Sequence, residues 1–550
     1  MRKHQRWHSA LPKGGIFLVV SFWLTAANAQ PPFTPIILND PTPQGSSRFG
    51  AALAGVGDVN GDGTPDLVVA GGGQAFVFSG ADRTLLRILD DPTPEAGALG
   101  EAVAGVGDVN GDGTPDLLVG ASGQIVGGNT GQGQAFVFSG ADGSLLHTLD
   151  DPTPQASAGF GTAVAGVGDV NGDGTPDLLV GTPFQDAGPN IGQGRAFVFS
   201  GADGNLLHTL DDPTPQAFAE FGFAVAGVGD VNGDGTPDLL VGARHQTVGG
   251  NDIQGQAFVF SGADGNLLHT LDSPTPQDGQ FGVALAGVGD VNGDGTPDLL
   301  VGAPLQTVGG DVFQGQAFVF SGADGSLLYT LNDPTPTGAN QFGFALAAVG
   351  DVNGDGTPDV LVGAPVQVQG RAFVFSGADG NLLHTLTIPP GPGPLALGFG
   401  GAVAAVGDVD GDGTPDLLVG EPGFKSEQGR AILFVSTPLI IEVSVDILPG
   451  AINPTTPRVI IPVAILTTRR FVATKVDPLS VRFGPTGATE VDGQGQFQDI
   501  NGDGKTDLLL HFRTGATGVA CGDTEASLTG KTFDGVPIHG SDSFVTVGCP

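Results

Sequence analysis

The sequence predicts an all-β fold, a seven-bladed β-propeller followed by a small C-terminal β-sandwich-like domain. Three observations lead to this prediction. One ten-residue string, with a single Asn-to-Asp change in its last copy, recurs seven times between residues 49 and 435. Short runs of β-branched and aromatic residues flank every copy and are separated by clusters of Gly, Asn and Asp. No stretch of this region shows the period of a helix.

Composition narrows the class of partner. The 550 residues include 20 Lys+Arg and 58 Asp+Glu, a formal net charge of -38, and 40% of them are hydrophobic. Because so acidic a chain has no general attraction for phosphate backbones or anionic lipid, we expect no binding to nucleic acid or to membrane surfaces. Divalent cations are its natural counter-charge. The hydrophobic content argues against a disordered acidic segment.

The N-terminus predicts export. Residues 1–29 have a basic front, an apolar stretch from Ile16 to Leu24 and a small-residue cleavage site at Ala27-Asn28-Ala29, so the mature chain is expected to start at Gln30. The alternative, an uncleaved membrane anchor, would need a run of roughly 20 apolar residues. No other segment of the sequence could span a bilayer. We therefore predict a secreted protein, extracellular or at the cell surface.

The recurring string is Gly-Asp-Val-Asn-Gly-Asp-Gly-Thr-Pro-Asp. Its first Asp is residue 58, 108, 169, 230, 290, 351 and, in the last copy, 408. Spacings of 50 to 61 residues indicate a repeated supersecondary unit, as in propellers and solenoids. We assign residues 30–438 to this repeat domain.

Each unit contains four predicted strands. In the fourth unit they are Phe223–Val228, Leu239–Gly242, Gln256–Phe260 and Leu267–Leu271, with the Asp-rich loop between the first two and a loop of variable sequence between the second and third. Four antiparallel strands per unit favour a propeller over a β-solenoid, whose coils are shorter and lack hairpin turns.

The two ends of the repeat domain are expected to close the ring. The seventh unit lacks a fourth strand, and residues 38–43 repeat residues 331–336, the end of a fourth strand. Pro35–Asn39 therefore supplies the missing outer strand of the last blade and removes an open sheet edge. Leu439–Val443 is the competing candidate for this place.

The Asp-rich loops predict calcium sites. Positions 1, 3, 5 and 9 of each loop carry Asp, Asn, Asp and Asp, position 7 offers a backbone carbonyl, and glycines at positions 4 and 6 allow a tight curl. Hard oxygen ligands at this density select Ca²⁺ over zinc or Mg²⁺. The pattern matches the first half of an EF-hand loop but lacks the Glu at position 12, so we predict a calcium-binding β-hairpin. The alternative is a plain Asn- and Gly-rich turn with surface carboxylates.

An eighth copy lies in the C-terminal region, so up to eight calcium ions are predicted. The predicted ligands are Asp58, Asn60, Asp62, Thr64, Asp66, Asp108, Asn110, Asp112, Thr114, Asp116, Asp169, Asn171, Asp173, Thr175, Asp177, Asp230, Asn232, Asp234, Thr236, Asp238, Asp290, Asn292, Asp294, Thr296, Asp298, Asp351, Asn353, Asp355, Thr357, Asp359, Asp408, Asp410, Asp412, Thr414, Asp416, Asp499, Asn501, Asp503, Lys505 and Asp507.

The repeat resembles a known family. Phe281-Gly282, the loop from Asp290 to Asp298, and Gly302-Ala303-Pro304 are similar to the FG-GAP repeat of the integrin α-subunit propeller and its bacterial relatives. The resemblance covers roughly residues 31–438 and is specific in the calcium loop. Gly-Ala-Pro is intact only in the fifth and sixth units, and Leu99 replaces the Phe of the second. The resemblance implies an extracellular, calcium-stabilised propeller used in adhesion or ligand binding.

Catalysis finds little support in the sequence, and we predict neither catalytic nor cofactor-binding residues. His147, His208, His269 and His384 occupy one repeated strand position, so they are spread around the ring and cannot converge. Both Trp residues lie within residues 1–29, which argues against a typical sugar-stacking protein. We therefore predict a monomeric, non-enzymatic protein that binds an extracellular protein or glycan, with its most variable loops, between strands 2 and 3, as candidate contacts. The alternatives are a secreted polysaccharide lyase or hydrolase and a non-binding structural matrix protein.

Residues 439–550 form the predicted C-terminal domain. Val459–Leu466, Val481–Phe483, Leu508–Phe512 and Phe544–Val547 read as its strands. Cys521 and Cys549, the only cysteines, are expected to form a disulfide because the chain is predicted to be exported.

Overall fold

The computed structural model describes residues 33–549 except 44, 94–98, 367–369, 389–397, 425–427, 437–440, 449, 469–470, 492 and 534–536. The predicted signal peptide (residues 1–29) and the predicted mature start, Gln30, lie outside the described residues. So do residues 425–427 of the last variable loop and the predicted domain boundary at residue 438.

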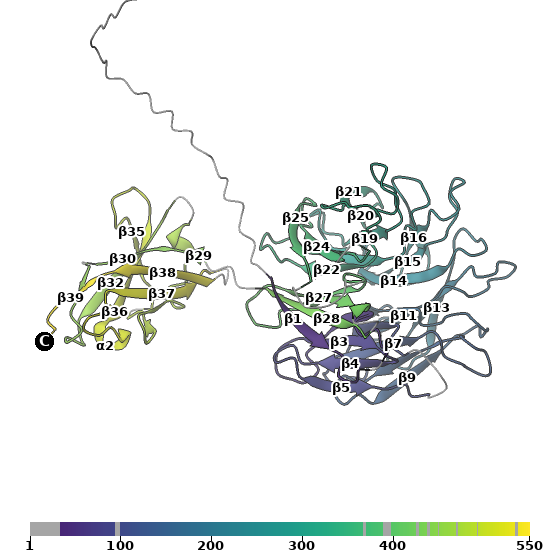
Figure 1. Cartoon of the computed structure of the whole chain (residues 1–550), viewed down its shortest axis with the longest axis horizontal. Helices are drawn as coiled ribbons and strands as arrows, with labels where there is room; N and C mark the ends of the chain where they lie inside the picture. The colour runs from purple at the N-terminus through teal and green to yellow at the C-terminus, as the bar shows by residue number, and fades with distance from the viewer. Residues whose placement is uncertain are drawn as a thin grey trace, which may run out of the picture.

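The repeats fold into four-stranded antiparallel sheets, which are the blades of a propeller (Figure 1). Six of these sheets are continuous in sequence. Their strands are β2 Ala52–Gly57, β3 Asp66–Gly71, β4 Gln74–Phe78 and β5 Leu85–Leu89; β6 Ala102–Gly107, β7 Asp116–Ala121, β8 Gln134–Phe138 and β9 Leu145–Asp150; β10 Ala163–Gly168, β11 Asp177–Thr182, β12 Arg195–Phe199 and β13 Leu206–Asp211; β14 Phe221–Gly229, β15 Asp238–Ala243, β16 Gln256–Phe260 and β17 Leu267–Asp272; β18 Leu285–Gly289, β19 Asp298–Ala303, β20 Gln316–Phe320 and β21 Leu327–Asn332; β22 Leu346–Gly350, β23 Asp359–Ala364, β24 Arg371–Phe375 and β25 Leu382–Leu386.

A seventh sheet joins the two ends of the repeat region. It contains β26 Val403–Gly407, β27 Asp416–Glu421, β28 Arg430–Ser436 and, as its outer strand, β1 Phe33–Asn39. β1 pairs antiparallel with β28, and its Phe33 lies opposite Ser436. The predicted strand from the N-terminal side is confirmed. The competing candidate is wrong, because Ile441–Glu442 (β29) pairs with a strand of the C-terminal domain instead.

Ring closure follows from the contacts between blades. The first strand of each blade contacts the first strand of the next, and β26 of the last blade contacts β2 of the first. In the first five blades these innermost strands approach the preceding blade closely because they carry glycine at the contact, whereas the sixth and seventh blades have Ala348 and Ala405 there. A Cβ added at Gly227 would lie 2.9 Å from the carbonyl oxygen of Gly166 in the preceding blade. The prediction of a propeller is confirmed.

The core lies between neighbouring blades. The second strand of every blade is buried along its whole length, as expected for a strand covered on both faces. One such layer joins Leu179 and Val198 of one blade to Phe221, Val241 and Phe258 of the next. In the first, third, fourth, fifth and sixth blades the Phe of the Phe-Gly pair packs against the two Phe of its own third strand, and in the last blade Phe399 packs against Phe434. Most Phe residues are therefore core residues and do not form a binding surface.

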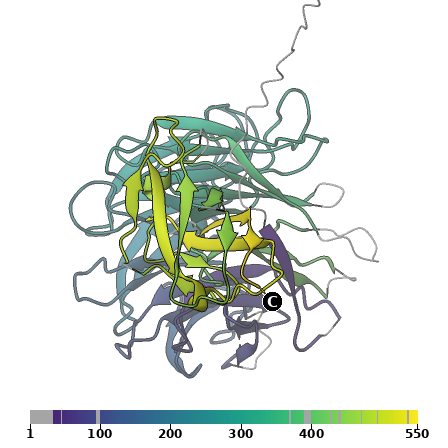
Figure 2. The ribbon, with the colours of Figure 1, turned by 90° about the vertical axis from the view of Figure 1, so that its left-hand side faces the viewer.

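The C-terminal strands form two further sheets that share one hydrophobic core, as in a sandwich (Figures 1 and 2). One sheet has the order β29-β38-β37-β33-β34 and the other β30-β32-β36-β35, while β31 and β39 pair separately. The elements are β29 Ile441–Glu442, β30 Ser444–Ile447, β31 Ala451–Ile452, β32 Ile460–Leu466, η1 Ala473–Lys475, β33 Arg482–Phe483, β34 Ala488–Thr489, β35 Gln496–Gln498, β36 Asp507–Arg513, α2 Thr514–Thr517, β37 Glu525–Lys531, β38 Pro537–Ser543 and β39 Val545–Thr546.

Candidate functional site

Each predicted calcium loop of the propeller connects the first two strands of a blade and curls around its own first carboxylate. In the fourth blade Asp230 accepts hydrogen bonds from the backbone N–H groups of Gly233 (2.7 Å), Asp234 (3.1 Å) and Gly235 (2.8 Å). Gly233 and Gly235 have φ of +76° and +90°, values that strain any other residue. The pattern recurs in all seven propeller loops, so the sequence string encodes one defined curl.

The side chains at positions 3 and 5 are held in the same curl. Asn232 Oδ1 accepts from the backbone N–H of Asp234 at 2.8 Å, and Asp234 Oδ1 accepts from that of Thr236 at 2.8 Å. Hydrogen bonds from Asn232 and Thr236 hold the pKa of Asp234 below its usual range. The loop therefore keeps an ionised carboxylate at position 5 next to the oxygens of positions 1 and 3.

The Asp at position 9 has a structural role that the sequence interpretation missed. Asp238 is fully buried, and its two oxygens accept from the backbone N–H of Val231 (2.9 Å) and of Gly262 (3.0 Å). Gly262 begins the turn between the third and fourth strands, so Asp238 joins both hairpins on one face of the blade. Burial raises its pKa. In Asp359 and Asp416 burial raises the pKa to about 7.

The seventh loop brings three carboxylates together. Oxygens of Asp408, Asp410 and Asp416 lie within 4.8 Å of one another, the only such group of acidic, His or Cys side chains among the described residues. Asp412 at position 5 instead accepts a hydrogen bond from Ser436 Oγ at 2.9 Å. Burial and the neighbouring carboxylates raise the pKa of Asp410. An all-oxygen, multiply charged set of this kind fits a hard divalent cation.

The repeats match known family models. The model for FG-GAP-like repeats matches residues 58–119 and 351–419, and that for the FG-GAP repeat matches residues 160–199, 221–260 and 281–320. Integrin α-subunits are among the similar proteins. Integrin alpha pat-2 of Caenorhabditis briggsae is 34% identical over 243 residues, and integrin alpha-IIb of Mus musculus is 40% identical over 171 residues.

This chain is an integrin-alpha-like FG-GAP repeat protein. Integrin alpha-4 of Xenopus laevis extends the similarity to half of the chain, at 27% identity over 288 residues. The matched regions cover 40%, 29% and 50% of this chain but only 19%, 16% and 26% of the three relatives, in the order given. The chain therefore matches only about a sixth to a quarter of the length of these relatives.

The eighth loop lies outside the FG-GAP repeats, between β35 and β36 of the C-terminal domain. Asp499 accepts from Gly502 and Gly504 as in the propeller, and the buried Asp507 accepts from Ile500 (3.0 Å) and Thr467 (2.7 Å). At position 7 Lys505 replaces Thr, and its Nζ lies 3.1 Å from Asp503 Oδ2. This ammonium group competes with a cation for the carboxylate at position 5.

The repeated histidines do not come together, in agreement with the sequence analysis. Three of them instead contact the following blade. His147, His208 and His269 each place Nε2 3.0 Å from a glycine carbonyl in the turn between strands 3 and 4 of the following blade. Tyr329 donates from its hydroxyl to the equivalent Gly377 oxygen at 2.6 Å. These side chains connect adjacent blades, which sequence spacing alone could not reveal.

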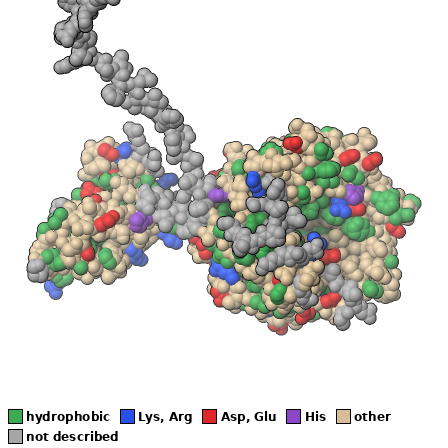
Figure 3. Space-filling view, in the orientation of Figure 1, with side chains coloured by type: hydrophobic (Ala, Val, Ile, Leu, Met, Phe, Trp, Pro, Cys, Tyr) green, Lys and Arg blue, Asp and Glu red, His purple; other side chains and the backbone are tan. Residues whose placement is uncertain are grey.

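The face opposite the FG-GAP calcium loops carries the variable 2–3 loops and the connections between blades. Large hydrophobic side chains are exposed there, including Phe184, Ile191, Phe218, Val312 and Phe313. Figure 3 shows acidic side chains spread over the visible surface of the propeller, with hydrophobic groups between them. We call the face of the propeller that carries the 2–3 loops and the connections between blades the loop face.

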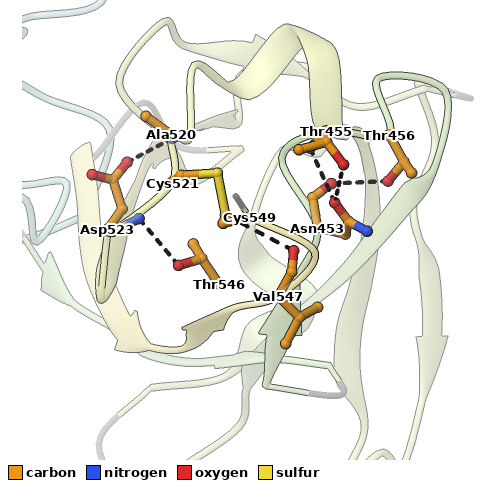
Figure 4. The surroundings of a disulfide bond; sticks show 10 residues. Asn453, Thr455, Thr456, Ala520, Cys521, Asp523, Thr546, Val547 and Cys549 are labelled. Carbon is orange, nitrogen blue, oxygen red and sulfur yellow. Dashed lines mark hydrogen bonds between the residues drawn. A yellow bond between two sulfur atoms is a disulfide. The ribbon is translucent and has the colours of Figure 1, made fainter.

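The predicted disulfide is present. Cys521 and Cys549 are bonded, and nearby hydrogen bonds from Ala520 to Asp523 (2.8 Å) and from Gly522 to Thr546 (3.1 Å) hold the same turn (Figure 4). The bond therefore fixes the end of the C-terminal domain. Within the described residues, no helix is long and apolar enough to cross a membrane.

Proposed function

We propose that this protein is a secreted, calcium-binding propeller that binds an extracellular protein through its loop face, as in cell adhesion. The observation that carries the proposal is the repeated loop curl, in which acidic and amide oxygens are positioned by glycines and by a buried Asp. Export is inferred from residues 1–29 and is consistent with the disulfide. A glycan ligand is the alternative partner.

Calcium would be held by positions 1, 3, 5 and 9 and by the carbonyl of position 7. It would add positive charge to a chain whose formal net charge is -38. At a tenfold excess over Kd each ion stabilises the folded state by about 1.4 kcal/mol. Several ions would therefore decide whether the ring stays folded, and a folded ring holds the loop face in shape.

Calorimetric titration with calcium and thermal unfolding with and without a chelator test the calcium part of the proposal. We expect saturable binding and a melting temperature that falls when calcium is removed. Asp234→Asn in one loop should remove or weaken one site. Asp264→Asn is the matched control, because Asp264 is an exposed acid on the same face, in the turn between strands 3 and 4. A melting temperature that is the same with and without the chelator contradicts the calcium part of the proposal.

Binding to immobilised extracellular proteins and to a glycan panel tests the ligand part. Calcium-dependent binding that is saturable and lost on substitution of the loop face supports the proposal. Turnover of a polysaccharide would instead support the enzyme alternative. Binding that is unaffected by substitutions on the loop face would place the ligand elsewhere.

A further inference from the structure

The junction of the third and fourth blades carries a side-chain cluster that departs from the repeat. Glu220, in the connection into the fourth blade, accepts from Arg244 Nε at 2.7 Å and lies 3.0 Å from His245 Nδ1. The guanidinium of Arg244 also stacks over Phe223, 3.4 Å from the ring centroid. Gln280, in the next connection, lies 2.8 Å from His245 Nε2. The cluster therefore holds the positively charged guanidinium of Arg244 in one fixed position on the loop face.

The other repeats show that the fold does not need this cluster. The position of Arg244 is occupied by proline in the third, fifth and sixth repeats, as Pro183, Pro304 and Pro365. The third repeat has Ser157, Gly159 and Thr162 where the fourth has Phe218, Glu220 and Phe223. The fourth repeat thus has a larger residue at all four positions, and the four lie on the same face of the ring. They are Phe218, Glu220, Phe223 and Arg244.

Two of these residues are held in a costly backbone conformation. Phe218 has φ of 59° and Glu220 has φ of 56°, in the left-handed region that disfavours bulky side chains. At the position of Glu220 the third repeat has Gly159, whose φ is 69° and which adopts this conformation without strain. The same conformation recurs at equivalent positions of other repeats, at Ser157 (φ 60°), Gln280 (54°) and Gln341 (55°), so the repeat itself imposes it. What distinguishes the fourth repeat is the large exposed side chain that Phe218 places there.

The cluster leaves groups available to a ligand. In the part of the chain that the structure describes, only Nε of Arg244 has a hydrogen-bond partner, so its two terminal amino groups are free. Phe218 is 62% exposed and Ile191 61%, and the two are joined by a 2.8 Å hydrogen bond from the N–H of Phe218 to the carbonyl of Ile191. Arg244 is held by Glu220, which lies two residues after the exposed Phe218 in the chain, and an arginine combined with exposed apolar anchors is the composition of an interface hot spot.

We propose that this junction binds an extended segment of a protein ligand that carries a carboxylate next to a bulky apolar side chain. The free edge of Arg244 matches a carboxylate with two parallel hydrogen bonds. Phe218 and Ile191 take the apolar side chain. A peptide is favoured over an acidic polysaccharide because outside residues 1–29 the chain has no Trp, and its single Tyr, Tyr329, is bonded to Gly377 on the opposite face.

This inference rests on the proposed function and adds the chemistry of the ligand. The probe is an array of short synthetic peptides in two sets that differ only by Asp or Asn at the centre, with Phe, Leu or Ser beside it. The full-length protein is applied in millimolar calcium. We expect retention of the Asp set, strongest beside Phe or Leu.

The variants install residues that other repeats already carry, so they are compatible with the fold. Arg244→Pro and Phe218→Ser should each weaken binding to the Asp peptides, Arg244→Pro on the order of tenfold because a charged hydrogen bond is lost. Arg83→Gly is the control, because Arg83 lies in a turn between strands 3 and 4 where the second repeat has Gly143. It should bind as the parent protein does.

Each result decides the proposal. Equal retention of Asp and Asn peptides, or undiminished binding by Arg244→Pro, overturns it. A lower melting temperature in Arg244→Pro without a change in peptide preference overturns it too, because the cluster would then only tether two loops. Displacement of the peptide by polygalacturonate that itself binds through Arg244 reassigns the site to an acidic polysaccharide. If no peptide binds while calcium still raises the melting temperature, this inference fails and the calcium part of the proposed function stands.

Discussion

The junctions between blades of continuous chain differ from the junction at which the ring is closed. Between the third and fourth blades His208 reaches from one fourth strand to the carbonyl of Gly262 in the next blade, at 3.0 Å. Between the sixth and seventh blades the equivalent His384 has no such turn to bond, because the last blade takes its fourth strand from β1. It packs edge-on against Phe33 of β1 instead, with ring centroids 5.0 Å apart.

The difference teaches how a repeat is adapted where the chain ends meet. A directional hydrogen bond is replaced by an aromatic contact, and Nε2 of His384 is buried without a partner among the described residues. The closing blade depends on packing of β1, whose Leu38 is buried in the layer between the last and first blades. Four predictions test this contrast, from the largest expected effect to the smallest.

Truncation of a buried side chain on the strand that closes the ring should have the largest effect. Leu38→Ala should lower the free energy of unfolding by about 2–5 kcal/mol, because it leaves a cavity between two blades. The measurement is denaturant unfolding in calcium. Ile37→Ala on the same strand is the control, because Ile37 is 40% exposed and should change stability by no more than about 0.5 kcal/mol. Equal effects would show that β1 does not close the ring by its buried face.

Loss of the buried carboxylate that joins the two hairpins of one blade, and so holds Gly262 at an ordinary junction, comes next. Asp238→Asn places an amide where two backbone N–H groups need acceptors, so it should cost about 1–3 kcal/mol even in a chelator. Asp234→Asn, at an exposed position of the same loop, should leave stability in the chelator unchanged and reduce only the stabilisation by calcium. Thermal unfolding of both variants with and without calcium makes the distinction. If Asp238→Asn has no effect in the chelator, the bridge between the hairpins is not a stability element.

Removal of the two histidines should give opposite results. His208→Phe leaves the carbonyl of Gly262 without its partner and should cost about 1 kcal/mol. His384→Phe removes a buried nitrogen that has no partner and keeps a ring against Phe33, so stability should be unchanged or higher. Chemical denaturation of the two variants checks this. A larger loss in His384→Phe than in His208→Phe would contradict the account of the closing junction.

The smallest effect is a dependence on pH. Burial lowers the pKa of His384 in the folded state. The unfolded chain therefore takes up a proton before the folded one does. The contribution of His384 to stability is complete above about pH 6.5, declines as the pH falls toward the folded-state pKa, and levels off below it. Stability measured across this range should fall less in His384→Phe than in the parent protein, and identical profiles would contradict the prediction.

Much of the architecture could be read from the sequence because the repeat is nearly invariant. The loop string fixes the hairpin between the first two strands, and the copy of residues 331–336 at residues 38–43 predicted which segment closes the ring. The sequence treats the carboxylates of each loop as one set of predicted calcium ligands. Their roles were not separated, because the sequence shows an Asp at position 9 but not that its oxygens face Val231 and Gly262.

By itself the sequence determined the strand pattern, the FG-GAP repeats and the oxygen-rich loops, since these depend on residues close together in the chain. Only the tertiary structure decided which side chains connect adjacent blades and which exceptions to the repeat gather in one place. Glu220, Arg244 and Gln280 belong to different segments, and His208 meets Gly262 more than fifty residues later. Such contacts arise from the closure of the ring, which places equivalent positions of successive blades side by side.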